Sequence, residues 1–379
     1  MPVAYLDNCA TTAVCPEAAA AAMRAMTEIY GNPSSLHGMG VAAEELVRGA
    51  RSGIARSLRC APEEIYFTSG GTESNNLAVI GATHALRRRG SRIVTTMAEH
   101  PSVGRAADYL EKEGFEVIRL RPGRNGSVSA DDLEKAINKE TILVSVMLVN
   151  NETGAFQPVE AARRAIKAAG APALVHCDAV QAYGRVRFSP ATLGADLISV
   201  SAHKIHAPKG VGALYIARGT RIEPIVFGGG QEKGLRSGTE PVPAIAAFGE
   251  AVRIAFSGFD EYVPYIAQLR NKCREALLSI PGITVNSPEN GAPHILNISC
   301  RGVRSETMLH FLESRGVYVS SGSACSRGRG SEVLRAMGLP QADIDSALRI
   351  SFSRYSTGDD VSALAQAVAA GLNALAHVR

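Results

Sequence analysis

The chain has 379 residues, of which 46% are hydrophobic and 20% charged, and its formal net charge is +4. This length predicts one large domain and a smaller one, the composition argues against long disordered stretches, and the small charge gives no sign of nucleic-acid binding. Residues 1–14 lack the basic and apolar regions of a signal peptide, and no run of about 18 apolar residues follows. We therefore expect a cytoplasmic protein without a membrane span.

The cysteine pattern excludes two kinds of small stabilising site. Seven cysteines occur, an odd number, and none of them forms a C-x-x-C pair. The sequence therefore indicates neither a disulfide framework nor a tetrahedral zinc site. We expect most of the cysteines to be small buried residues.

From about residue 65 to residue 216, short β-rich runs alternate with amphipathic helical stretches. The expected strands are 65–68, 92–95, 116–118, 142–149, 174–177, 197–200 and 211–216, and the expected helices are 72–88, 102–113 and 158–169. Such alternation predicts βαβ units around a largely parallel sheet. Ligands of these sheets bind beyond the carboxyl ends of the strands, so we expect the chemistry in the loops after these runs.

After about residue 258 the pattern changes. A long helical stretch is followed by shorter strands and helices, namely 262–278, 295–299, 305–315, 317–319, 348–352 and a final helix. This order predicts a second domain of the α+β class.

The segment Phe67–Asn75 runs from a β-stretch through Gly70 and Gly71 into a helix that begins near Thr72. Glycines let the backbone approach an anion closely, and the free amides of a helix N-terminus bind phosphate. The segment therefore has the form of a phosphate-binding turn. An ordinary strand-to-helix turn capped by threonine fits it equally well.

Two later strands end in chemically useful side chains. A buried run delivers Lys204, and a lysine in a dry pocket loses its charge easily, so that its amine can form an imine. Lys209 instead lies in a turn-like Pro-Lys-Gly sequence, and a solvated loop lysine is the alternative for Lys204. Another strand ends at Asp178, which could keep a pyridinium nitrogen protonated or simply cap a helix. The order of turn, aspartate and lysine along one sheet edge favours a shared cofactor site.

These residues resemble the cysteine desulfurases of the class V aminotransferase group. The matching segments span nearly the whole chain and are Tyr5–Thr12, Gly31–Ser35, Thr68–Asn75, Glu99–His100, Val149–Gly154, His176–Gln181, Ser201–Gly210, Arg236–Thr239 and Ser320–Cys325. The pairing of His203-Lys204 with a distant Ser-Ser-Gly-Ser-Ala-Cys325 is specific to this family. By this resemblance the chain is identified as a member of the cysteine desulfurase family.

The resemblance also implies the fold. It is that of a fold-type I PLP-dependent transferase of the α/β class, with a mainly parallel seven-stranded sheet in the large domain. That domain would cover residues 14–258. A smaller α+β domain, formed by residues 1–13 and 259–379, would carry the catalytic cysteine loop.

Pyridoxal 5'-phosphate is the cofactor that the resemblance implies. Lys204 would hold it covalently, His100 would stack on its ring, and Asp178 would pair with the ring nitrogen. The remaining contacts would come from Gly71, Thr72, Asn151, Gln181, Ser201 and His203, with Thr239 supplied by the second subunit of a homodimer. Gln181 would bond the phenolic oxygen, and Gly71, Thr72, Ser201, His203 and the partner's Thr239 would hold the phosphate.

For the substrate, the resemblance implies L-cysteine bound through its carboxylate by Asn151 and Arg349. A bidentate arginine suits a carboxylate, although a solvated surface pair is the alternative for Arg349. Cys325 would attack the substrate sulfur, which leaves a persulfide and releases L-alanine, and His100 would shuttle the proton. Arg327 and Arg329 could lower the pKa of the thiol.

Other readings stay open at this point. Another fold-type I activity, such as an aminotransferase or a selenocysteine lyase, is the first alternative, although transamination needs no thiol such as Cys325. A non-catalytic partner of iron–sulfur scaffolds is the second, and Lys204, Asp178 and Cys325 argue against it. No resident metal site is predicted, but Cys325 could ligate an iron–sulfur cluster transiently.

Two departures from the family pattern leave the sulfur acceptor undecided. Cys9 stands where the family often has asparagine, and we expect a tolerated small residue there. Residues 326–332 lack the Leu-Glu-Pro-Ser-like insert of long-loop members. The acceptor could be an iron–sulfur scaffold or a tRNA-thiolation protein.

Overall fold

A computed structural model describes residues 3–321 and 330–375 of the chain. The strands of its largest sheet are β2 (Ile65–Thr68), β3 (Arg92–Thr96), β4 (Glu116–Leu120), β5 (Thr141–Ser145), β6 (Leu174–Asp178), β7 (Leu197–Ser201) and β8 (Gly212–Ile216). They lie in the order β2-β8-β7-β6-β5-β3-β4. The five strands from β7 to β4 are parallel to their neighbours, which confirms the predicted fold class.

Strand β8 is an exception within this mainly parallel sheet, because it runs antiparallel to both β7 and β2. Residues 202–211 connect β7 to β8 and form only a short 3-10 turn, η2 (Ala202–Lys204). A parallel pair needs a crossover of a dozen or more residues, so this connection can only reverse the chain. The reversal leaves Lys204 in a turn at the carboxyl end of β7.

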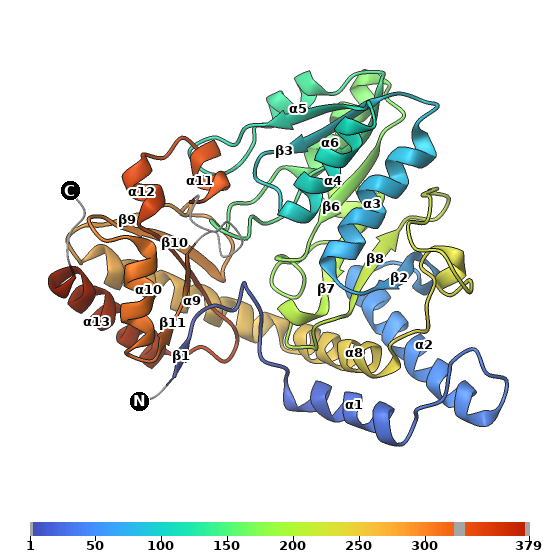
Figure 1. Cartoon of the computed structure of the whole chain (residues 1–379), viewed down its shortest axis with the longest axis horizontal. Helices are drawn as coiled ribbons and strands as arrows, with labels where there is room; N and C mark the ends of the chain where they lie inside the picture. Colours follow the sequence, from blue (N-terminus) through green and yellow to red (C-terminus); the bar gives the residue numbers. More distant parts are fainter. Residues whose placement is uncertain (1–2, 322–329, 376–379) are drawn as a thin grey trace.

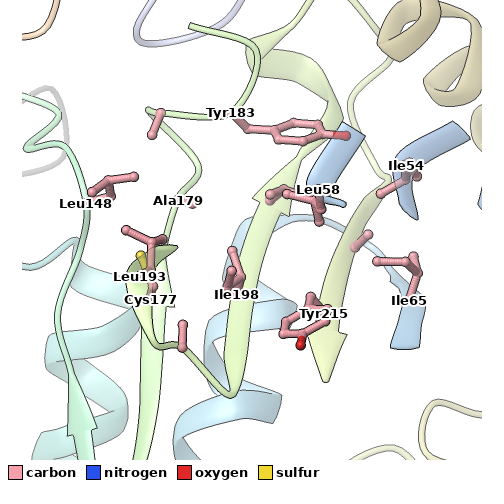
Figure 2. Packing of buried hydrophobic residues seen from close by; sticks show 14 of the residues in the cluster. Ile54, Leu58, Ile65, Leu148, Cys177, Ala179, Tyr183, Leu193, Ile198 and Tyr215 are labelled. Carbon is pink, nitrogen blue, oxygen red and sulfur yellow. The ribbon is translucent and has the colours of Figure 1, made fainter. Parts of the chain in front are cut away.

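Helices surround this sheet (Figure 1). They are α1 (Pro16–Thr27), α2 (Gly38–Leu58), α3 (Gly71–Leu86), α4 (Pro101–Lys112), α5 (Ala130–Ala136), α6 (Val159–Ala169), α7 (Pro190–Leu193) and α8 (Val242–Ser257). Strands β5, β7 and β8 are buried along their whole length, as expected for a sheet covered on both faces. Figure 2 shows how Ile54 and Leu58 of α2 pack near Ile198 of β7 and Tyr215 of β8.

A second, antiparallel sheet lies beside the first, in the order β12-β13-β10-β9 (Figure 1). Its strands are β9 (Ile283–Val285), β10 (Ile295–Cys300), β12 (Ser320–Ser321) and β13 (Ala347–Ser351), and a short parallel pair joins β1 (Ala4–Tyr5) to β11 (Val317–Tyr318). The helices of this part are α9 (Phe259–Leu278), α10 (Ser305–Glu313), α11 (Glu332–Ala336), α12 (Gln341–Asp345) and α13 (Gly358–Ala374).

The two sheets have separate hydrophobic cores. Leu6 packs in the core of the smaller sheet, together with Leu296 and Ile350, whereas Cys9 and Cys15 belong to the core of the larger one. The chain therefore passes from one core to the other between residues 6 and 9. We propose that residues 14–258 form one domain and that residues 1–13 and 259–379 form the other, with residues 9–13 lying against the larger core.

Helices α8 and α9 link the two parts and meet at Gly258 with a bend of 77° (Figure 1). Among the described residues, no single helix is long and apolar enough to cross a membrane. Only the bent pair of α8 and α9 reaches that length and composition when its two helices are taken together.

The described cysteines are all free thiols. Five of them are buried, and Cys60 is partly exposed. This agrees with the expectation that most cysteines serve as small core residues.

Candidate functional site

The predicted phosphate-binding turn brings the start of α3 against the end of β7. Gly70 has a φ of 148°, a region that favours glycine. A side chain at Gly71 would place its Cβ 2.7 Å from Cγ2 of Val180 and 3.5 Å from Cβ of Ser201, so this close approach requires glycine. The Ser201 hydroxyl is buried and has no hydrogen-bond partner among the described residues. A phosphate group at the open amides of α3, beside Thr72, would satisfy it.

A hydrogen-bond network connects the carboxylate of Asp178 to the ring of His100. Asp178 ends β6, and its Oδ2 accepts from Asn75 Nδ2 at 2.7 Å, while its Oδ1 accepts from the Val180 amide at 3.0 Å. Asn75 Nδ2 also donates to Ser102 Oγ at 2.8 Å, and that oxygen lies 2.7 Å from His100 Nδ1. Asn75 and Ser102, for which the sequence predicts no role, connect the Asp178 carboxylate to the His100 ring.

The network fixes the tautomer of His100. Its Nδ1 accepts a hydrogen bond from the Ser102 amide at 3.2 Å, so this nitrogen carries no proton. The Ser102 hydroxyl accepts from Asn75 and directs its own proton to the same Nδ1. Burial lowers the pKa of His100 below its usual 6.5. Near neutral pH the ring is therefore neutral, with its proton on Nε2, as a proton shuttle requires.

Lys204 has the properties of an amine primed for covalent chemistry. Burial lowers its pKa from the usual 10.5 to about 8. Its Nζ donates to the carbonyls of Cys9 at 2.5 Å and Ala10 at 2.9 Å. Lys209, in contrast, is exposed in a bend. The two lysines therefore differ in exposure, with Lys204 half-buried and Lys209 exposed, as expected from the sequence.

The N-terminal segment of residues 9–11 contacts three of the predicted site residues. Besides Lys204, Gln181 donates through Nε2 to the Cys9 carbonyl at 3.1 Å, and its Oε1 is buried without a partner among the described residues. The His203 Nδ1 lies 3.2 Å from Thr11 Oγ1. Burial lowers the pKa of His203 to about 4, so its ring is neutral near pH 7. Cys9 itself is buried and uses its backbone carbonyl here.

Arg349 lies on β13 of the smaller sheet, and its side chain reaches Asp7 and the segment of Asn151. Its side chain is 6% exposed, so the alternative of a solvated surface pair is wrong. Nη2 contacts Asp7 Oδ1 at 2.9 Å, Nη1 donates to the Asn151 carbonyl at 3.1 Å, and Nε is buried without a partner among the described residues. Burial raises the pKa of Asp7. A substrate carboxylate at Arg349 would therefore compete with Asp7, which the sequence analysis did not single out.

Cys325, Arg327 and Arg329 lie outside the described residues, but the chain just after them is anchored at the site. The Ser331 hydroxyl donates to the carboxylate of Glu152 and caps α11 by accepting from the Leu334 amide at 3.0 Å. Burial raises the pKa of Glu152 to about 7. Glu152 directly follows Asn151, so the predicted substrate-binding segment also holds the chain that continues from Cys325.

Thr239 is exposed in the single chain. Its loop is tied to the first turn of α3 by the ion pair of Arg236 Nε with Glu73 Oε1 at 2.8 Å. The loop is thus fixed beside the phosphate-binding turn while the threonine faces outward. An outward-facing threonine at this position is available to a second subunit.

We predict that Asn75→Ala weakens cofactor binding about 10-fold and lowers the free energy of unfolding by about 1–3 kcal/mol, because the buried carboxylate of Asp178 loses a donor. The Kd from a cofactor titration and a denaturant melt measure the two effects. Asn76→Ala is the matched control, since within the described part of the chain that amide nitrogen donates to the backbone carbonyls of Thr72 and Ser102 alone. Equal Kd values for both variants would contradict the role of Asn75.

Comparison with known proteins gives consistent matches. Residues 4–364 match the family described as "Aminotransferase class-V". A relative named "Cysteine desulfurase IscS", from Methanosarcina thermophila, is 40% identical, with 96% of this chain and 90% of that protein covered. A solved structure titled "NIFS-LIKE PROTEIN" superposes with a TM-score of 0.94 at 38% identity and covers 99% and 100% of the two chains. Another, titled "SspA in complex with cysteine", has a TM-score of 0.82 at 31% identity and covers 93% and 99%.

Proposed function

The chain belongs to the class-V aminotransferase family and is a cysteine desulfurase, and from this premise we propose that it binds pyridoxal 5'-phosphate on Lys204 and transfers the sulfur of L-cysteine to Cys325. The products are L-alanine and a persulfide on Cys325. Atoms and electrons balance without a further reactant, because one sulfur atom moves from the substrate carbon to the thiol while that carbon gains a proton.

The observation that best supports this proposal is the state of Lys204. Burial lowers the pKa of this half-buried amine to about 8, and the residue follows β7, whose last residue, Ser201, lies against the phosphate-binding turn. An amine that loses its proton easily and an anion site at one strand end suit a cofactor that carries both an aldehyde and a phosphate.

The described residues fit the cofactor in three places. The unpaired Ser201 hydroxyl and the α3 amides suit the phosphate, together with Gly71, Thr72 and His203. The carboxylate of Asp178, which is held by Asn75, suits a protonated ring nitrogen. The side-chain amide of Gln181 suits a hydrogen bond to the phenolic oxygen. When bound, the cofactor supplies an aldehyde carbon for the substrate amine and a ring that accepts an electron pair.

The chain's own residues then bind the substrate and move its proton. The substrate carboxylate replaces Asp7 as the partner of Arg349, and Asn151 lies beside it. The neutral amine of Lys204 accepts the proton from the substrate α-carbon. His100, close to the substrate sulfur, donates its Nε2 proton to the carbon that loses this sulfur. The thiolate of Cys325 attacks that sulfur, and L-alanine leaves.

The proposed function is tested by supplying L-cysteine to the purified, cofactor-loaded protein. We expect L-alanine to accumulate with one sulfane sulfur for each alanine. Alanine is measured by chromatography and sulfane sulfur by cyanolysis. A protein that releases pyruvate or a keto acid instead would have a different activity of this fold.

The lowered pKa of Lys204 predicts a pH dependence of cofactor uptake. Only the neutral amine attacks an aldehyde, and a pKa of about 8 means that the neutral fraction rises through this pH. We expect the rate of covalent uptake by the cofactor-free chain to rise with pH, with a midpoint near 8. Stopped-flow absorbance measures this rate. A midpoint near the ordinary 10.5 would show that burial does not lower the pKa of this amine.

We propose that the enzyme is a twofold homodimer in which Thr239 completes the phosphate site of the partner subunit. Large apolar side chains are exposed along the second half of α1 and the segment after it, namely Met23, Met26, Tyr30 and Leu36. Leu36 is fully exposed, which is unusual for a leucine and supports a covered surface in the assembly.

We expect light scattering to give twice the mass of one chain, and we expect Thr239→Ala to raise the Kd for the cofactor about 10-fold. A mixing experiment separates the two subunits' contributions. Chains with Thr239→Ala and chains with Lys204→Ala would together form one intact site per mixed dimer, so the mixture would regain tight cofactor binding. No gain on mixing would show that Thr239 does not act across the dimer.

We propose that the Cys325 persulfide passes to an acceptor protein of iron–sulfur cluster assembly or of tRNA thiolation. The free thiols of the described cysteines fit a reducing compartment, and we propose the cytoplasm. Mass spectrometry of co-purifying proteins that carry a transferred persulfide would identify the acceptor.

A further inference from the structure

A small cavity lies between the turn of Lys204, helices α8 and α9, and the chain just after β13. It has a volume of about 20 Å³. Its polar lining comes from Arg185, Lys204, His206, Tyr262, Ser353 and Arg354, and none of the described residues that line it is an aspartate or glutamate. The cavity therefore combines cationic side chains with no carboxylate.

Arg185 is buried at this cavity without a carboxylate partner among the described residues, and its side-chain neighbour is Cys9. Its Nη2 donates to the Lys204 carbonyl at 2.6 Å, whereas its Nη1 is buried without a hydrogen-bond partner among the described residues. A buried guanidinium with an unpaired donor and no carboxylate beside it is costly, so a ligand that supplies an acceptor and a negative charge would be bound favourably.

Arg354 adds a second positive charge at the same cavity. It is half-buried, and its Nη2 donates to the neutral Tyr355 hydroxyl at 3.2 Å, the one hydrogen bond of this nitrogen among the described residues. The other titratable side chains of the lining do not balance the two arginines. Burial, together with the charges of Arg185 and Arg354, lowers the pKa of His206 to about 3. Burial raises the pKa of Tyr262 to about 12, so its hydroxyl stays protonated and donates to the Gly184 carbonyl.

We propose that this cavity is a binding site for a monatomic anion, chloride in the cell, held between Arg185 and Arg354. The size selects the class of ligand, because the volume holds about one water-sized particle. A monatomic anion fits so small a space more readily than a tetrahedral phosphate or sulfate does. The half-exposed Arg354 provides the route of entry, and Arg185 provides the unpaired donor.

The site would connect the salt around the enzyme to the environment of Lys204. Arg185 bonds the backbone of Lys204, and its charge is one of those that act on the Lys204 amine. A halide beside Arg185 offsets part of this charge. The electrostatic field behind the cofactor-binding lysine would then depend on whether the anion is bound. The proposal rests on the cavity and its arginines and does not depend on the proposed reaction.

The first test locates the anion. Crystals of the full-length, cofactor-loaded protein are soaked in sodium bromide, and data are collected at the bromine absorption edge. We expect an anomalous peak in the cavity, within hydrogen-bond distance of Arg185 Nη1. A water molecule in that position with no anomalous signal would overturn the proposal.

The second test measures binding in solution, by melting the protein in chloride and in gluconate at equal ionic strength. Gluconate is too large for the cavity. We expect the Tm of the wild-type protein to be about 2 °C higher in chloride, the shift for a ligand at roughly ten times its Kd. Arg354→Gln should lose most of this difference, and Arg354→Lys should keep part of it. Arg88→Gln, which changes an exposed arginine, is the matched control and should keep all of it.

Two outcomes would contradict the halide site. If the wild-type Tm is the same in both salts, Arg185 is balanced within the protein, for example by the neighbouring Cys9 thiol. If Arg354→Gln and Arg88→Gln respond equally, the effect of chloride is a general one on the protein surface. The choice of Arg354 for substitution keeps the test independent of folding, because its side chain is only half-buried.

Discussion

Replacing Lys204 by alanine is expected to abolish covalent attachment of the cofactor and to lower kcat for alanine formation by about 10⁴-fold. The expected loss is large because one amine has two roles, as the covalent anchor and as the base at the substrate α-carbon. Its lowered pKa, about 8, suits both roles, since each needs the neutral amine. Borohydride reduction followed by peptide mass spectrometry measures attachment, and a steady-state assay with L-cysteine measures kcat.

Lys209→Ala provides the control, because this exposed lysine lies only five residues further along the same turn. It should keep both the attached cofactor and nearly all of the activity. Reduced cofactor on Lys209 in the wild-type protein, or a fully active Lys204→Ala variant, would refute the assignment of the anchoring lysine.

Replacing Cys325 by serine is expected to leave cofactor loading unchanged and to reduce alanine and persulfide formation to the background, by about 10³-fold or more. The thiolate acts only on the substrate sulfur, so its loss leaves the cofactor site intact. Absorbance of the bound cofactor and alanine release are measured on the same sample. Cys60→Ser is the control, since burial raises the pKa of that partly exposed thiol to about 12 and leaves it a poor nucleophile.

The fold could be predicted from the sequence because its signals are periodic and repeated. Apolar runs alternate with amphipathic helices from residue 65 onward, and the strands and helices are found there with shifts of a few residues at their ends. The sequence predicts a mainly parallel sheet but does not mark β8 as its antiparallel exception, because Val211–Ile216 resembles the parallel strands in composition. Only the length of the preceding connection, residues 202–211, indicated that the chain must reverse.

Some residues of the site could be predicted and others could not. Asp178 and Ser201 end strands and Lys204 lies in the turn directly after one, so their common sheet edge follows from the order of elements. Asn75 and Asp7 act through partners that lie about 100 and 340 positions away in the chain. No local pattern marks such a partner, because an asparagine in a helix and an aspartate near the N-terminus are ordinary surface residues in most sequences.

The burial of Arg349 could not be predicted either. Its strand could be predicted, but the sequence alone left open whether the side chain is solvated or buried. In the structure the guanidinium bonds the Asn151 carbonyl and the Asp7 carboxylate, which lie far from it in the chain. Contacts between domains of this kind depend on the tertiary arrangement, which a local hydrophobic pattern does not encode.

The central claim is that sulfur from L-cysteine is held on Cys325 before it reaches any acceptor. The most direct measurement is to mix the cofactor-loaded protein with one equivalent of L-cysteine without reductant, alkylate it at once, and map the persulfide by peptide mass spectrometry while alanine is counted in the same sample. We predict that the sulfane sulfur is found on Cys325, with one alanine for each persulfide. Sulfane sulfur on another cysteine, such as Cys9, or alanine formed without any protein persulfide would contradict the claim.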